Sequence, residues 1–276
     1  MYFSYLMVWK FVMWFILSLS ATSKSEKFDP SPFTENNVNI QDQSPVNIVS
    51  NQAKVLKLPP LECRKFETFE NSEVVIRNTG TTVDIEFPEG TLNIPEITGG
   101  PLLNIYQFKQ IHFHWGQGDE GSEHEIDGKR YAMELHIVFF NEILKSYDEA
   151  IKSPTGLTVI SILGQISSEN NTDLDAFIGD LQQLSSPNSE IRKNFISQFS
   201  WINNSISHNY YSYHGSLTTP PHSGSIIWIL MTNVFNISST QMGEFRHLHS
   251  KTGDKCIDSN FRTLQDLNGR TIYYSP

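Results

Sequence analysis

Three histidines with a distinctive spacing are the residues of this chain best suited to chemistry. His112 and His114 are separated by one residue, and His136 lies further along between Leu135 and Ile137. Side chains two residues apart on a β-strand point to the same face, so a neighbouring strand can supply the third imidazole. Three neutral nitrogen ligands leave the charge of a divalent metal almost undiminished and one coordination position open. This pattern is typical of a metal centre that activates water.

Polar neighbours of these histidines predict a second layer of contacts around the metal. Gln110 would share a strand face with His112 and His114, and Glu134 would share one with His136. A metal-bound imidazole needs an acceptor for its second N–H group, and an amide or carboxylate side chain can provide it. Imidazole ligands suit zinc, copper, nickel or iron, and zinc is favoured because the sequence shows no thiolate set, haem motif or facial carboxylate.

The segments that must position these residues have the composition of strands. Six runs are rich in β-branched and aromatic residues and are bounded by Gly, Pro or Asn: 74–76, 82–87, 110–115, 132–140, 157–166 and 225–234. Shorter helices are predicted at 143–152, 174–184 and 240–247. The strands lack the regular intervening helices of a doubly wound parallel sheet. We therefore expect a mainly β (α+β) fold, a single domain built on a large, predominantly antiparallel twisted sheet with short peripheral helices.

The length and charge of the chain limit the classes of function. With 276 residues, of which 38% are hydrophobic, the chain can bury one large core. The formal net charge is -10 and no basic stripe is present, so binding to nucleic acid or to anionic membranes is not expected. We interpret the acidity as a contribution to solubility.

The N-terminal region is typical of an exported protein. Lys10 precedes a short apolar run that ends in small residues, which predicts a signal peptide over 1–20 with cleavage near 20–23. A retained signal-anchor is the alternative, but the run is short for a membrane span. Residues 21–42 are polar and are expected to form an irregular arm outside the core, followed by the domain proper at 43–276. A secreted, extracellular protein without a stable membrane anchor is expected.

Two further features bear on export. Asn170, Asn203 and Asn236 each begin a sequon for N-glycosylation. Cys63 and Cys256 are the two cysteines, and they could close one long-range disulfide in an oxidising compartment. Because the sequence does not show whether their β-carbons meet, the paired and the free forms both stay open.

Six short motifs, taken in order, are similar to those of the alpha-class carbonic anhydrases. They are Gln43-Ser44-Pro45-Val46-Asn47-Ile48, Gln110-Ile111-His112-Phe113-His114-Trp115-Gly116, Ser122-Glu123-His124, Tyr131-Ala132-Met133-Glu134-Leu135-His136, Gly215-Ser216-Leu217-Thr218-Thr219-Pro220-Pro221 and Asn260-Phe261-Arg262. The resemblance covers residues 43–274 with few gaps. It implies reversible hydration of carbon dioxide to bicarbonate and a proton by a zinc-bound hydroxide. It also implies inhibition by sulfonamides or anions, and esterase activity only as a side reaction.

The resemblance implies a role for each residue of the site. Zn²⁺ would be held by His112, His114 and His136, and these ligands would be supported by Gln110, Glu134 and the carbonyl group of Asn260. Thr218 would accept a hydrogen bond from the hydroxide and donate its own proton to an ionised Glu123. Carbon dioxide would meet an apolar wall of Val138, Val159, Leu217 and Trp228, with Thr219 beside it.

The chain departs from the family pattern at the position that usually relays protons. Fast members carry a histidine at the cavity mouth, whereas alignment of residues 80–87 places Thr81 there. A hydroxyl group that does not titrate near neutrality is an inefficient relay, so we expect turnover to be limited by proton transfer. The N-terminal Trp-Gly-Tyr segment of the family is not visible in residues 21–42, which puts the aromatic packing beside the cavity in doubt. His214 and His222 stand where the family commonly has proline and cysteine.

A second class of function is open beside the enzyme. Relatives that have lost zinc ligands use this fold as a binding or adhesion module with little catalysis. Here the three histidines are present together with Glu123 and Thr218. This complete set favours a carbonate dehydratase, that is, a zinc lyase, over the binding module.

Overall fold

The computed structural model describes residues 31–35, 39, 41–194, 202, 205–206 and 209–276. The predicted signal peptide and the sequon at Asn203 lie outside the described residues. The predicted N-terminal arm is described from residue 31 onward, with gaps at 36–38 and 40.

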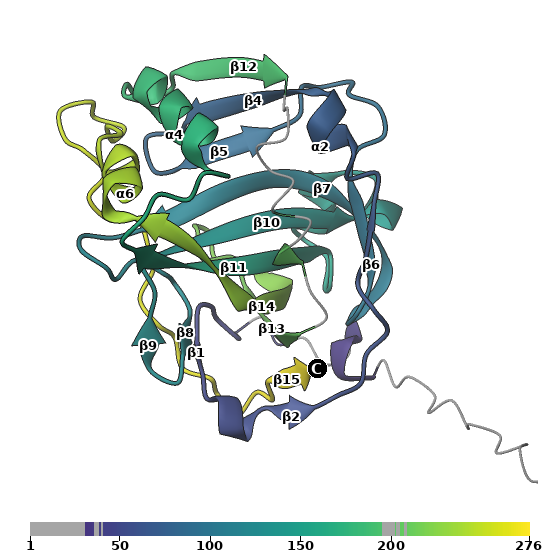
Figure 1. Ribbon diagram of the computed structural model, residues 1–276. Coiled ribbons are helices and arrows are strands. Elements are labelled where there is room, and N and C mark those ends of the chain that lie inside the picture. The colour runs from purple at the N-terminus through teal and green to yellow at the C-terminus, as the bar shows by residue number, and fades with distance from the viewer. Residues whose placement is uncertain (1–30, 36–38, 40, 195–201, 203–204, 207–208) are drawn as a thin grey trace, which may run out of the picture.

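A large mixed sheet of 12 strands forms the centre of the described structure (Figure 1). Ten of its strands lie on one path, in the spatial order β12 (Glu190–Asn194), β4 (Glu73–Asn78), β5 (Val83–Glu86), β7 (Leu102–Trp115), β10 (Met133–Asn141), β11 (Leu157–Ser167), β14 (Gly224–Ser238), β13 (Tyr210–Ser216), β15 (Tyr273–Ser275) and β2 (Lys54–Val55), and β3 (Glu62–Arg64) and β6 (Glu96–Gly99) lie off this path. Neighbours on this path are antiparallel except for β11 with β14 and β15 with β2. The predicted fold class is therefore confirmed, and the six predicted strand segments all fall within this sheet.

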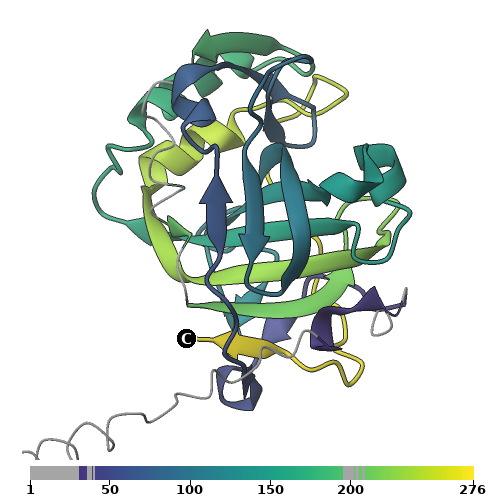
Figure 2. The same ribbon diagram turned by 90° about the vertical axis from the view of Figure 1, so that its right-hand side faces the viewer.

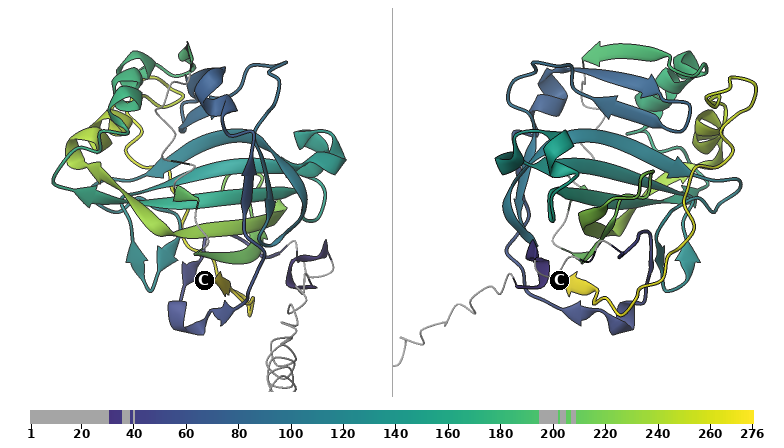
Figure 3. Two further views of the ribbon diagram at one scale, coloured as in Figure 1. Left: turned by 45° about the vertical axis from the view of Figure 1, so that its right-hand side comes forward. Right: turned by 180° about the vertical axis from the view of Figure 1, so that it is seen from behind.

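Smaller strands extend the architecture at its edges. β3 pairs with β6, which in turn pairs with the start of β7. This pair runs across one end of the main sheet (Figure 2). A separate small sheet contains β1 (Asn47–Ile48), β8 (Glu125–Ile126) and β9 (Lys129–Arg130). After α6 (Ser239–Arg246) the chain continues largely without regular structure until β15, as seen from behind in Figure 3.

The helices are short and peripheral, as predicted. They are η1 (Ser31–Phe33), η3 (Ser50–Gln52), α2 (Thr68–Asn71), η4 (Glu142–Leu144), α3 (Tyr147–Ala150), α4 (Asp175–Leu181), η5 (Gln182–Leu184) and α6 (Ser239–Arg246). The predicted helix at 143–152 is divided into η4 and α3 because Lys145 adopts a left-handed conformation between them. The predicted helix at 174–184 likewise consists of α4 and η5.

Two apolar clusters lie on opposite faces of the central strands. In β10, Leu135, Ile137 and Phe139 belong to the larger cluster, and Val138 belongs to the other. The larger cluster includes Phe113 of β7, which packs against Phe177 of α4 and Phe245 of α6 at ring distances of 5.3 Å. Because side chains alternate along a strand, this contact directs the neighbours of Phe113 to the opposite face. Those neighbours are His112 and His114.

Phe33 corrects the expectation that the arm lies outside the core. This residue of η1 is 1% exposed and belongs to the larger cluster. Its ring lies 5.7 Å from the ring of His214 and 5.4 Å from that of Tyr273. An apolar ring needs burial wherever it lies in the sequence, and the polar composition of residues 21–42 concealed this one. Phe33 therefore supplies aromatic packing, although the family's Trp-Gly-Tyr segment is missing.

The His214 contact predicts a dependence of stability on pH. Burial, reinforced by the nearby Arg270, lowers the pKa of His214 to about 4, against about 6.5 in an unfolded chain. Between these values the unfolded chain binds more protons, so stability is complete above pH 6.5 and falls as the pH decreases toward 4. Urea unfolding at pH 7 and pH 5 should show a loss of about 1–2 kcal/mol from this group. The variant His214→Gln should lose that part of the slope, and an unchanged slope would contradict the assignment.

Candidate metal centre

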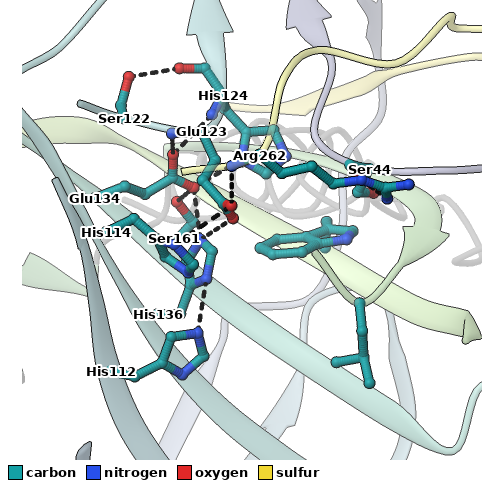
Figure 4. A network of polar contacts seen from close by, with 12 residues as sticks. Ser44, His112, His114, Ser122, Glu123, His124, Glu134, His136, Ser161 and Arg262 are labelled. Carbon is teal, nitrogen blue, oxygen red and sulfur yellow. Dashed lines mark hydrogen bonds and ion pairs between the residues drawn. The ribbon is translucent and has the colours of Figure 1, made fainter. Parts of the chain in front are cut away.

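Two adjacent strands bring the three predicted histidines together. In the ladder between β7 and β10, His112 stands opposite His136, and His114 stands opposite Glu134. His112 is 9% exposed, His114 is 2% exposed and His136 is 1% exposed. One nitrogen atom of each lies within 4.8 Å of the others, a grouping that could hold a metal ion (Figure 4).

The hydrogen bonds of the rings define which nitrogen atoms are free. His136 Nε2 lies 2.7 Å from Glu134 Oε1, so this nitrogen carries the proton and Nδ1 keeps its lone pair. His136 Nδ1 faces His112 Nε2 at 3.2 Å. His114 Nδ1 lies 3.1 Å from the carbonyl oxygen of Asn260, which leaves the buried Nε2 atom of His114 without a partner among the described residues. Three ring nitrogens thus converge as lone-pair donors, which fits a metal with imidazole ligands.

The environment keeps the three imidazoles neutral. Burial lowers the pKa of His114 to about 4. Burial, together with the neighbouring imidazoles, lowers the pKa of His112 well below its ordinary value, and burial also lowers the pKa of His136. Metal ligation requires the unprotonated imidazole, so these shifts favour the form that binds a metal.

Glu134 is the centre of the hydrogen-bond network behind the histidines. Its side chain is fully buried and accepts five hydrogen bonds: from the backbone N–H groups of Glu123 and His124, from His124 Nδ1, from His136 Nε2 and from Ser161 Oγ, at 2.6–2.8 Å. Burial alone would raise the pKa of Glu134. The interactions with His124 and His136 outweigh it and hold this pKa well below the usual range. The carboxylate therefore fixes both the orientation and the tautomer of His136.

Gln110 does not make the contact that the sequence suggested. It stands opposite Val138 in the ladder, and the Nδ1 atom of His112 has no hydrogen-bond partner among the described residues. The pairing of β7 with β10 shifts register between Val138 and Phe139, next to this position. This irregularity lies on the side of Gln110 away from His112, and the pairing from Gln110 to His114 is regular. Gln110 therefore keeps the strand face of His112 but makes no hydrogen bond to its Nδ1 atom.

Glu123 and Thr218 lie beside the histidines as a second polar group. Glu123 Oε1 accepts a hydrogen bond of 2.9 Å from the backbone N–H of Arg262 and lies 3.3 Å from His114 Nδ1. Burial, reinforced by Glu134, raises the pKa of Glu123, and the effects of His136, the Thr218 hydroxyl group and the Arg262 N–H offset only part of this rise. Thr218, which is 7% exposed, is close enough to oppose the rise, but Glu123 Oε2 has no hydrogen-bond partner among the described residues.

The predicted apolar wall forms one row across three strands. Val138 of β10 pairs with Val159 of β11, which pairs with Trp228 of β14. All three are 1% exposed, and Leu217 belongs to the same cluster at 9%. The Trp228 ring centre lies 4.9 Å from that of His136, so the row lies next to the imidazoles.

A cavity of about 970 Å³ leads from the histidines to the surface. Its lining includes His112, His114, Thr218 and Thr219, and Thr81 lies toward solvent. The Oγ1 atom of Thr81 lies 3.0 Å from Oγ1 of Thr79, and neither hydroxyl group titrates near neutral pH. Thr81 thus presents to the cavity a group that does not change its charge near neutral pH.

A buried chain of hydrogen bonds behind Glu134 was not predicted from the sequence. His124 Nε2 lies 2.6 Å from the Tyr213 hydroxyl group, which lies 2.9 Å from Ser44 Oγ. Ser44 and His124 belong to two of the quoted motifs, but Tyr213 belongs to none. Tyr213 lies in β13, a strand that the sequence analysis did not predict, and its neighbours in the sequence gave no sign of the polar contact.

The remaining candidate residues lie away from the histidines. Cys63 and Cys256 are both free, so the disulfide considered from the sequence is not formed. Cys63 lies in β3, where burial raises its pKa to about 12, and Cys256 is exposed at the cavity rim. Asn170 and Asn236 are exposed. Among the described residues, no helix has the length and apolar character needed to cross a bilayer.

A buried set of three imidazoles on a large sheet, with one cavity leading to it, is the arrangement of a metalloenzyme that acts on water. Comparison with known proteins is specific: residues 30–276 match the family model of the eukaryotic-type carbonic anhydrases. The chain is 36% identical to human carbonic anhydrase 7 over 240 residues, which cover 83% of this chain and 87% of that protein. It is 32% identical to human carbonic anhydrase 6 over 238 residues (84% and 75%), and 32% identical to human carbonic anhydrase 3 over 240 residues (84% and 88%). The chain therefore belongs to the eukaryotic-type carbonic anhydrase family and is a carbonate dehydratase, an enzyme that hydrates carbon dioxide.

The chain of hydrogen bonds behind Glu134 yields a stability prediction. The variant Tyr213→Phe removes the partner of His124 Nε2 and leaves that nitrogen buried and unsatisfied, which should cost about 1–3 kcal/mol in the free energy of unfolding. Tyr274→Phe is the matched control, because this partly exposed ring packs on Tyr211 at 5.3 Å and should cost less than about 0.5 kcal/mol. Urea denaturation measures both. Equal costs would show that these hydrogen bonds contribute nothing.

Proposed function

We propose that this chain hydrates carbon dioxide with zinc held by His112, His114 and His136, and that proton transfer limits its turnover. The observation that supports the zinc site most directly is that one ring nitrogen of each histidine points toward the same place. In His136 and His114 the other ring nitrogen carries the proton and donates it to a carboxylate or carbonyl oxygen, so the converging nitrogen keeps its lone pair. The donor set is all imidazole, and this favours zinc among the transition metals once geometry and availability are considered. When bound, zinc lowers the pKa of a water molecule toward neutrality, an effect for which carbonic anhydrases are themselves the standard example.

The residues behind the ligands hold them in the productive form. Glu134 keeps the proton of His136 on Nε2, and the carbonyl oxygen of Asn260 keeps that of His114 on Nδ1. Both rings therefore present the opposite nitrogen to the metal. Gln110 has no such contact with His112, so this ligand would be held by its packing in the sheet.

Thr218 and Glu123 would orient the attacking water. Glu123 accepts a hydrogen bond from the backbone N–H of Arg262 and is close to the Thr218 hydroxyl group. If an ionised Glu123 accepts a hydrogen bond from the Thr218 hydroxyl group, the lone pairs of the Thr218 oxygen remain free to accept a hydrogen bond from water in the cavity. A water oxygen held by that acceptor keeps a lone pair for the substrate.

Carbon dioxide is apolar and offers no charge for ionic binding, so its site should be an apolar surface. The row of Val138, Val159 and Trp228 beside His136, with Leu217, would supply that surface next to Thr219, which lines the cavity. The bicarbonate product is charged and has less affinity for such a wall, which favours its release into the open cavity. Anions and sulfonamides should inhibit by competing at the metal.

The proton released in each cycle has to leave through the cavity mouth. Thr81 cannot carry it, because its hydroxyl group does not titrate near neutrality. Asp84, whose pKa burial raises to about 6, pairs in register with His112 but is not among the residues that line the cavity. The proton should therefore pass directly to bases from solution.

We further propose that the mature protein begins after a signal peptide at 1–20, with cleavage near 20–23, and is secreted with its arm at 21–42 and its domain at 43–276. The sequons at Asn170 and Asn236 support this, since both asparagines are exposed. Mass spectrometry of the protein secreted by cells would identify its first residue and any glycan.

Zinc content and catalysis can be measured on the same purified protein. We expect one equivalent of zinc and hydration of carbon dioxide in a stopped-flow assay, and we expect His136→Ala to lose both because two imidazoles leave the metal short of a ligand. His247→Ala is the control, since this histidine caps α6 away from the cavity lining. One equivalent of zinc without hydration above the His136→Ala background would instead favour a binding module.

Restoring a titratable group at the mouth tests the rate limit. The variant Thr81→His should raise turnover in weak buffer roughly ten-fold or more, because general acid–base transfer by a placed histidine is worth at least that much. Turnover in strong buffer should change little. Thr240→His, on the exposed start of α6, adds a histidine elsewhere and should have no effect. If Thr81→His behaves like this control, proton transfer is not the limiting step.

A further inference from the structure

The charge at the cavity mouth is opposite to the charge of the chain. The whole sequence has a formal net charge of -10. The charged side chains that line the cavity, apart from the histidines, are Lys251, Lys255 and Arg262 against Asp258 alone. A cleft that concentrates one sign of charge attracts ions of the other sign from solution.

A fixed loop holds the two lysines at this mouth. The backbone N–H of Lys251 donates to the Gly80 carbonyl oxygen at 3.0 Å, and the N–H of Ser250 donates to the Lys255 carbonyl oxygen at 2.7 Å. Asn78 Nδ2 also donates to the His249 carbonyl oxygen at 3.2 Å. These bonds tie the loop to the end of β4, directly before the segment that carries Thr81.

Lys251 packs closely against the residue that precedes Thr81. Gly80 has a positive φ of 74°, and a β-carbon added there would lie 2.7 Å from Cγ of Lys251. Only a glycine permits this approach. The stem of the Lys251 side chain is thereby placed next to the position from which fast relatives relay protons.

The charges of these lysines are available to a ligand. Lys65, Lys109, Lys152 and Lys193 each pair with a carboxylate. Lys251 and Lys255 are exposed and form no ion pair within the described part of the chain. Asp254, in the same loop, accepts a hydrogen bond from Thr252, and Arg262 donates to Gln43 and Ser44.

We propose that Lys251 and Lys255 select the base that removes the proton, and that they favour anionic bases over neutral ones. This inference rests on the proposed function, because it concerns the second substrate of that reaction. With hydrogen phosphate as the base, an O–H bond of a cavity water breaks, its electron pair stays on the water oxygen, and the proton bonds to a phosphate oxygen. Dihydrogen phosphate then leaves. No oxidant or further reactant takes part.

The expected size of the preference follows from the screening of charges in water. Attraction between exposed charges acts over a Debye length of about 30 Å at 0.01 M salt and about 3 Å at 1 M. Lys251 and Lys255 should therefore matter at low ionic strength and lose most of their influence at high ionic strength. A neutral base is not attracted by the lysines as it approaches the cavity. Its rate of proton removal should therefore be nearly independent of salt.

The experiment measures turnover of the zinc-loaded full chain at saturating carbon dioxide against the concentration of two bases of similar pKa. Hydrogen phosphate is the anionic base and 1-methylimidazole is the neutral one, at equal ionic strength. The readout is the ratio of their second-order rate constants, which a general loss of active enzyme would not change. We expect Lys251→Glu and Lys255→Glu each to lower this ratio roughly three-fold at low ionic strength, and the difference to vanish in high salt.

Lys152→Glu is the matched control. It makes the same change of charge on an exposed lysine that does not line the cavity, so it should leave the ratio and the catalytic efficiency for carbon dioxide unchanged. If Lys251→Glu fails to fold because of its contact with Gly80, Lys255→Glu still decides the question. A ratio that is equal in the wild type, both mouth variants and the control overturns the inference while hydration itself persists.

A binding measurement separates this inference from the proposed function. Inorganic phosphate titrated into the full chain should shift the backbone amide resonances of residues 250–258 more than those around Lys152, and Lys255→Glu should weaken the effect. Absence of such shifts overturns the inference. If the shifts are present but no base supports hydration, the anion site stands and the proposed function fails.

Discussion

The structure of the site depends on one buried carboxylate. Glu134 carries a negative charge in a place without solvent, which is tolerable only because five donors surround it. Those donors come from β10, from β11 and from the segment that contains Glu123 and His124. The need to satisfy one charge thus determines the relative positions of three segments. It also fixes His136, because that ring can serve the carboxylate only through Nε2 and so presents Nδ1 to the metal.

The register of the sheet is the second constraint, and apolar packing sets it. A shift of one residue in β7 would turn His112 and His114 to the opposite face and bring Phe113 into the cavity. Phe113 is held by Phe177 and Phe245, which belong to helices far along the chain. The helices on one face therefore secure the metal ligands on the other face, although they contribute no atom to the site.

The parts of the site that the sequence could predict are those that obey a local rule. The two-residue period of a strand was enough for His112, His114 and His136, and for Glu134 on the face of His136. Gln110 also shares the face of His112 by register, but a shared face does not determine the rotamer of a long side chain, and His112 Nδ1 is left without a hydrogen bond in the described part of the chain. Glu123, Thr218 and Asn260 lie in loops or at strand ends, where no period exists, so only the resemblance of whole motifs pointed to them. The His124–Tyr213 contact and the burial of Phe33 depend on segments that meet only in the folded chain, and no local pattern encodes such a meeting.

The same distinction separates the metal centre from its mouth. Glu134, His124 and His136 are buried and joined by hydrogen bonds, so replacing one of them leaves another buried polar atom without a partner. The side chains of Thr81, Lys251 and Lys255 are exposed, so replacing one of them leaves no buried polar atom without a partner. Under the proposed function, a change at these positions would alter the path of the proton and the charge that an incoming base meets, and would leave the histidines and the water-orienting residues in place. The chemistry at the metal and the rate at which protons leave it are therefore separate properties of this fold, because the first depends on a closed network and the second on a solvent-exposed rim.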